Sequence, residues 1–101
     1  MPANVPYIIM ASFPRTPVLP TFFGTVFTNP YSPTTLVLED AFGHFTLAGW
    51  TGAGNGIGTP GFSRVFTPPV GLLTGYRITF QAVGLDPITG WFRTNTEVKQ
   101  F

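Results

Sequence analysis

Glycine and proline interrupt this sequence at short intervals, and this spacing limits the elements that the chain can form. The longest run without either residue covers residues 91–101, and it lacks the apolar stripe of an amphipathic helix. Between the interruptions, apolar and polar residues alternate with a period of two, as they do in half-buried strands. The sequence therefore predicts short β-strands joined by turns.

Seven segments have the pattern or composition of strands: residues 5–12, 21–27, 34–40, 44–50, 62–67, 76–85 and 92–101. In residues 76–85, Ile78 and Phe80 share one face and Gln81 lies on the other. In residues 92–101, the alternation places Phe92 and Val98 on the same face. About seven short strands in a chain of this size predict an all-β fold, a small antiparallel β-sandwich, with a small β-barrel as the alternative.

The length of the chain predicts one domain, residues 1–101. Glycine and proline together supply 23 residues, but aromatic residues make up 16% of the chain and provide enough apolar surface for a core. Six of the glycines lie within residues 49–61, which we expect to form a flexible loop or a wide connection between strands.

Charged residues are scarce, at 9% of the chain against roughly 25% in ordinary domains, and the net charge is +1. Such a surface repels other copies weakly, so we expect a homo-oligomer or a subunit of a larger complex. The few basic residues are scattered, which argues against a nucleic-acid partner. No apolar run is long enough for a membrane-spanning helix, and no cysteine is present.

The segment "LDPITG" has the residues of a turn rather than of a reactive site. Asp86 is suited to accept a hydrogen bond from a backbone N–H two residues later, and Pro87 has the φ that the second position of a type I turn requires. Gly90 allows the positive φ that leads into the next strand. We therefore assign Asp86, Pro87 and Gly90 to a turn.

The residues that carry catalysis or bind metals form no convincing constellation. Glu39 and Asp40 precede His44 closely, but neighbouring residues of a strand point to opposite faces, so a solvated turn is favoured over a metal site. Ser63 lacks the second glycine of a nucleophile elbow. Residues 56–61 match G-x-G-x-x-G, but a strand pattern follows instead of a helix. The sequence predicts no catalytic residue, no metal and no cofactor.

Three aromatic residues lie beside predicted turns: Tyr31, Trp50 and Trp91. Such rings cover the ends of a core, bind a protein partner or stack against the C–H face of a sugar. The sequence leaves these three interpretations open.

The end of the chain resembles a β-sandwich domain that recurs at the C-terminus of secreted, uncharacterised proteins of planctomycetes and related bacteria. The opening "PYIIMAS" is similar to the first strand of that family, and the hallmark Q-A-x-x-L-D-P occurs near the end. Its residues here are Gln81, Ala82, Leu85, Asp86 and Pro87, followed by Thr94 and Asn95 of the closing strand.

The resemblance implies an extracellular or cell-surface module of structural or adhesive type, without assigned catalytic residues. Residues 1–5 show no signal-peptide pattern. Members of the family carry a further strand upstream of "PYIIMAS", and we expect that strand to be missing here if Met1 is the native start. Residues Tyr7, Ile8, Ile9 and Met10 would then form an open edge through which copies associate. Their apolar character on both faces is also typical of a central strand.

Overall fold

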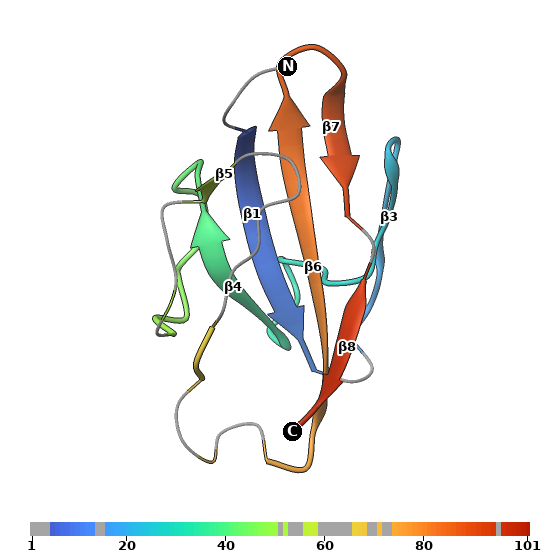
Figure 1. Cartoon of the computed structure of the whole chain (residues 1–101). Coiled ribbons are helices and arrows are strands. Elements are labelled where there is room, and N and C mark those ends of the chain that lie inside the picture. Colours follow the sequence, from blue (N-terminus) through green and yellow to red (C-terminus); the bar gives the residue numbers. More distant parts are fainter. Residues whose placement is uncertain are drawn as a thin grey trace.

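The computed structural model describes residues 5–13, 16–50, 52, 56–58, 66–68, 71, 74–94 and 96–101. These residues contain eight strands and no helix (Figure 1). The strands are β1 (Val5–Ser12), β2 (Leu19–Thr21), β3 (Gly24–Val26), β4 (Thr35–Asp40), β5 (Ile57–Gly58), β6 (Arg77–Asp86), β7 (Gly90–Arg93) and β8 (Glu97–Gln100). Most of the expected strand over residues 62–67 and of the glycine-rich segment 49–61 lies outside the described residues.

Strand β1 lies in the middle of the main sheet. It pairs antiparallel with β6 from Tyr7 to Ser12 and with β4 on its other side. The order of the sheet is β4-β1-β6-β7, with β5 added to β1 and β8 to β6. The prediction that Tyr7, Ile8, Ile9 and Met10 form an open edge is therefore wrong, because strands on both sides bond the backbone of this segment.

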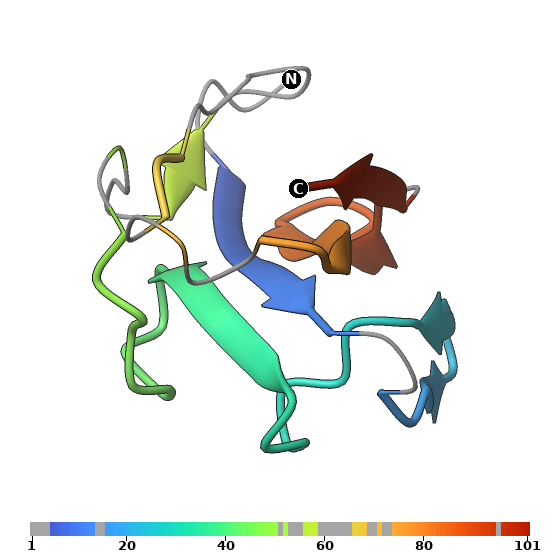
Figure 2. The same ribbon diagram turned by 90° about the horizontal axis from the view of Figure 1, so that it is seen from below.

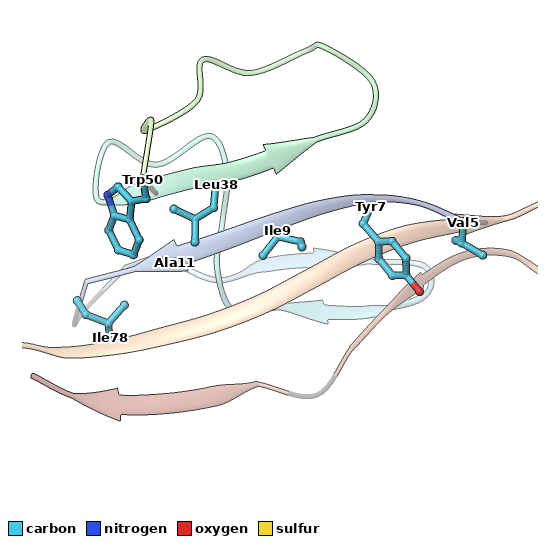
Figure 3. Packing of buried hydrophobic residues seen from close by; sticks show 7 residues of the cluster. All are labelled: Val5, Tyr7, Ile9, Ala11, Leu38, Trp50 and Ile78. Carbon is cyan, nitrogen blue, oxygen red and sulfur yellow. The ribbon is translucent and has the colours of Figure 1, made fainter. Parts of the chain in front are cut away.

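Both faces of the main sheet are covered by apolar side chains. Figure 3 shows the larger cluster on one face: Val5, Tyr7, Ile9, Ala11, Leu38, Trp50 and Ile78. The cluster on the opposite face consists of Met10, Val26, Val37 and Val83. Successive residues of β1 enter the two clusters in turn, as the period of two requires. A strand that is buried on both faces reads as a continuous apolar run, which explains the sequence of β1.

Strands β2 and β3 form a separate antiparallel hairpin. Val26 of β3 packs in the cluster of Met10, so the hairpin covers that face of the main sheet (Figure 2). The prediction of a single strand over residues 21–27 is wrong, because Phe22 and Phe23 form a turn between β2 and β3. Gly24 follows with a φ of 125°, a conformation that other residues rarely adopt.

Strands β7 and β8 follow one another along the same side of β6, and their register against β6 differs by one residue. Thr94 lies at the irregularity. Its hydroxyl accepts the N–H of Ala82, and its own N–H donates to the Ala82 carbonyl, both at 2.9 Å. The segment expected as one strand over residues 92–101 is thus interrupted, and Phe92 and Val98 lie on opposite faces instead of sharing one.

Residues 44–50, expected as a strand, are mostly irregular. Leu47 makes an isolated parallel bridge to Val37, and the N–H of Ala48 donates to the Val37 carbonyl at 2.9 Å. These contacts lie along the outer side of β4. The alternation of Phe45 and Leu47 is that of a strand, but no ladder forms here beyond the single bridge.

The protein is an all-β, antiparallel sandwich, as the sequence predicted. The main sheet is one layer and the β2–β3 hairpin is a smaller second layer. The described part of the main sheet stays open, with β4 at one side and the β7 and β8 pair at the other, so it does not close into a barrel.

Candidate functional site

The three aromatic residues singled out from the sequence are divided between the two faces of the main sheet. The Trp50 side chain is 4% exposed and packs in the larger core cluster. Tyr31 is 68% exposed and Trp91 is 37% exposed, and both line a depression on the opposite face of the sheet. Trp50 therefore covers the core, whereas Tyr31 and Trp91 are available to a partner.

The depression has a volume of about 210 Å³ and lies between the main sheet and the β2–β3 hairpin. Its walls and floor include Met10, Phe23, Tyr31, Phe45, Val83 and Trp91, and we call it the aromatic groove. The rings of Phe23 and Trp91 are stacked with centroids 6.4 Å apart, and Tyr31 meets Phe45 edge-on at 5.4 Å. The groove is thus built from rings that support one another.

Two further aromatic residues extend this surface, and sequence reasoning missed both. The ring of Phe42 lies 5.4 Å from that of Trp91, and Phe22, 87% exposed, packs edge-on against Phe23. Phe22 is exposed because it lies at the tip of the hairpin. The signal in the sequence was the segment "TFFG", in which a turn ahead of Gly24 would have placed an apolar residue at the surface.

The chemistry of the aromatic groove is mainly apolar. Among its polar groups, the hydroxyl of Thr21 already donates to the Gly24 carbonyl within the hairpin. Tyr31 and Trp91, which also line the groove, each carry one polar group, a phenol hydroxyl and an indole N–H. A site that orients a sugar needs several placed hydrogen-bonding groups, so this groove is better suited to an apolar ligand or side chain.

The acidic side chains near the turns hold the backbone. Asp40 accepts the N–H of Phe42 through one oxygen at 2.8 Å and those of His44 and Phe45 through the other, at 2.7 and 2.8 Å. Asp86 accepts the N–H of Ile88 at 2.8 Å in the turn between β6 and β7. Asp40 and Asp86 thus shape the turns in which they lie.

Glu39 is fully buried, and its carboxylate accepts the N–H of Gly56 at 2.9 Å. Its neighbour Asp40 is directed to the turn that contains His44, so the two acids do not converge. Within the part of the chain that the structure describes, no three His, Cys, Asp or Glu side chains gather as metal ligands would.

Gln81, which the alternation places on the face of β6 opposite Ile78 and Phe80, connects three segments. Its amide oxygen accepts the N–H of Phe27 at 2.8 Å, and the N–H and hydroxyl of Thr28 lie at 3.4 Å. Its amide nitrogen donates to the Thr94 carbonyl at 2.9 Å. Gln81 is therefore buried, and it joins the segment that follows β3 to the irregularity between β7 and β8.

The phenol of Tyr7 lies in an unusual electrostatic environment. Burial raises the pKa of its hydroxyl, and the negative charge of Asp86 raises this pKa further. Both causes disfavour the phenolate. Tyr7 therefore stays neutral in the folded protein at pH values where a free tyrosine begins to ionise.

Strand β8 presents a second candidate surface at the side of the main sheet. All four of its side chains are exposed, and β6 is its one strand neighbour among the described residues. Figure 1 shows β8 at the margin of the fold, close to the C-terminus. Sequence reasoning did not indicate β8 as an edge strand.

The fold and these surfaces define a class, a small all-β sandwich with an apolar groove and an exposed sheet edge. Comparison of the chain with family models, with curated proteins and with solved structures finds no match. No segment of the described chain is a helix with the length and apolar character needed to cross a membrane.

Proposed function

We propose that this protein is a non-catalytic assembly module that associates with copies of itself through an exposed sheet edge and adjoining apolar surface. The observation that carries the proposal is the position of β8. Its side chains are all exposed, and it has a single described strand neighbour. An edge of this kind offers unpaired backbone donors and acceptors to another strand.

The use of the polar side chains supports a structural role. Asp40, Asp86 and Glu39 accept backbone hydrogen bonds, and Gln81 connects separate segments. Groups used in this way hold the fold and are not positioned for proton transfer. The low charge of the surface, 9% of residues, also favours association over repulsion.

The setting that we propose, outside the cell or at its surface, rests on the resemblance to domains of secreted bacterial proteins. The residues of that resemblance have structural roles in this fold: Gln81 joins segments, Asp86 holds a turn and Thr94 bonds Ala82. A module of this kind in a larger complex would contribute shape and contact surface. Export of the native protein, measured by cell fractionation, tests this part of the proposal.

Light scattering of the untagged chain over a concentration series tests the assembly function. We expect a species heavier than the 11.0 kDa monomer. Its fraction of the total protein should increase as the protein concentration rises. A monomer at all concentrations up to the solubility limit would contradict self-association.

A second function, ligand binding, is favoured by one observation, the convergence of Tyr31 and Trp91 on the aromatic groove. The mainly apolar lining suits an apolar ligand better than a glycan, although the two rings also suit stacking on a sugar. Titration with an apolar dye and with soluble polysaccharides separates these ligands. Trp91→Ala should abolish binding at the groove, whereas Ile88→Ala, at an exposed turn residue, should not.

A further inference from the structure

The second layer packs against β7 at one side of the main sheet and leaves β8, on the same side, uncovered. The β2–β3 hairpin lies against β7: Gly24 of β3 is so close to Arg93 of β7 that a Cβ on this glycine would overlap the Arg93 side chain. Figure 1 shows β3 alongside β7. The side chains of β8 are all exposed, with Val98 at 54%.

The direction of the backbone groups of β8 follows from a bond at its end. The N–H of Phe101 donates to the Tyr76 carbonyl at 3.0 Å, in register with the pairing of β6 and β8. Because peptide groups alternate in direction along an antiparallel strand, the N–H groups of Lys99 and Glu97 also point toward β6. The N–H and C=O groups of Val98 therefore point away from the sheet, toward an incoming strand.

The side chains of this strand are complementary to a second copy of themselves. Val98 lies between Glu97 and Lys99, which carry opposite charges on the same face. We propose that two copies of this chain pair antiparallel through β8 about a two-fold axis at Val98. Glu97 of each copy then lies opposite Lys99 of the other, and the two Val98 residues exchange both backbone hydrogen bonds.

The charges select this register over its neighbours. If the axis is moved by one residue in either direction, the backbone groups still pair, but Lys99 lies opposite Lys99 or Glu97 opposite Glu97. Like charges in directly opposed positions destabilise a strand pair. A lysine on an edge strand ordinarily prevents pairing with another strand. In the register centred on Val98, Glu97 of the second copy lies opposite Lys99 and compensates its charge.

The arrangement produces a closed dimer rather than a filament. The two-fold pairing uses the β8 edge of both copies, so neither edge remains for a third. At the other side of the sheet, Val37 of β4 accepts the N–H of Ala48 and bridges Leu47. This inference rests on the proposed assembly function and narrows it to a second copy of the chain in one register.

Charge reversal in the 101-residue chain tests the register. Glu97→Lys and Lys99→Glu each place like charges in both cross-strand pairs, and we expect each to weaken dimerisation about tenfold or more. The double variant, which exchanges the two charges and keeps the net charge, should dimerise like the wild type. A mixture of the two single variants should form heterodimers, because their β8 strands are again complementary.

Sedimentation at matched concentrations measures the dimerisation of these variants, and circular dichroism verifies that they are folded. Val98→Pro adds a test of the backbone bonds, since it removes an outward N–H and keeps the N–H groups that point to β6. We expect Val98→Pro to be a folded monomer.

A wild type that remains monomeric would overturn the assembly function as well as this inference. A wild-type oligomer unaffected by the charge variants and by Val98→Pro would leave assembly standing and overturn the register.

Discussion

Gln81 shows how much a single polar side chain contributes to this fold. It is 3% exposed, and its amide bonds both the segment directly after β3, at Phe27 and Thr28, and the carbonyl of Thr94. Buried amides are tolerated where their donors and acceptors are used. Gln81 meets this condition and fixes the second layer on the sheet.

Replacement of Gln81 by leucine should lower the free energy of unfolding by about 2–4 kcal/mol, because the N–H of Phe27 loses its acceptor and the carbonyl of Thr94 loses the shorter of its two hydrogen bonds. Urea denaturation measures this change. Gln100→Leu is the matched control at an exposed position and should change the stability by less than about 0.5 kcal/mol. Equal losses in the two variants would refute the role assigned to Gln81.

The stability of the protein should also depend on the ionisation of Tyr7. The pKa of this phenol is raised above its ordinary value of 10.0 by burial and by Asp86. The unfolded chain therefore loses this proton at lower pH than the folded chain does. The contribution is fully present below the ordinary pKa, and the free energy of unfolding falls as pH rises from there through the folded pKa.

Denaturation of Tyr7→Phe over the same alkaline range isolates this effect. The variant should lose less stability than the wild type as pH rises from neutral to above 10.0, because phenylalanine has no proton to release. Parallel declines in the two proteins would show that Tyr7 does not cause the pH dependence.

At the level of residues, the sequence predicts contacts between near neighbours in the chain, but it does not predict contacts between residues far apart in the chain. The turn at Asp86 depends on neighbours within three positions, which the segment "LDPITG" displays. The bonds of Gln81 reach Phe27 across 54 positions, and no local pattern indicates them. The groove at Trp91 depends in the same way on a hairpin far away in the sequence.

Among the elements, β1, β4 and β6 lie within one residue of the strands that the sequence predicted, β6 from its alternation and β1 from its apolar run, because each runs without a turn residue at its centre. The hairpin at residues 19–26 and the division between β7 and β8 were missed for different reasons. The turn at Phe22 and Phe23 uses aromatic residues in place of the usual turn formers. The irregularity at Thr94 leaves the polar and apolar alternation of the sequence unchanged while it changes the register.

The contact between β1 and the segment at Gly56 gives a prediction at this scale. The carbonyl of Gly56 accepts the N–H of Tyr7 at 2.6 Å, and a Cβ on this glycine would lie 2.8 Å from the Tyr7 carbonyl oxygen. Gly56→Ala should therefore destabilise the protein by more than the roughly 1 kcal/mol that the φ of 78° alone costs.

Gly75→Ala is the matched control for this substitution. Gly75 has a similar φ of 85°, but nothing lies within 4 Å of a Cβ built there. Thermal unfolding of the two variants separates strain in φ from steric overlap. Similar losses at both glycines would contradict a close approach of backbone at Gly56.

At the scale of the whole molecule, a small second layer leaves a large sheet partly uncovered. The hairpin covers β7 and one face of β1, while the β8 edge and the rings of Phe22, Tyr31 and Trp91 remain exposed. With so few charged side chains at its surface, the protein has little electrostatic protection against association. These features together are the reason for proposing assembly as the function.

Amide hydrogen exchange of Val98 at low and high protein concentration tests this account most directly. The N–H of Val98 points outward from β8, whereas that of Lys99 points to β6. We predict that Val98 exchanges rapidly in dilute solution and becomes protected as concentration rises, while the exchange of Lys99 is already slow in dilute solution. Rapid exchange of Val98 at every concentration would contradict association through β8.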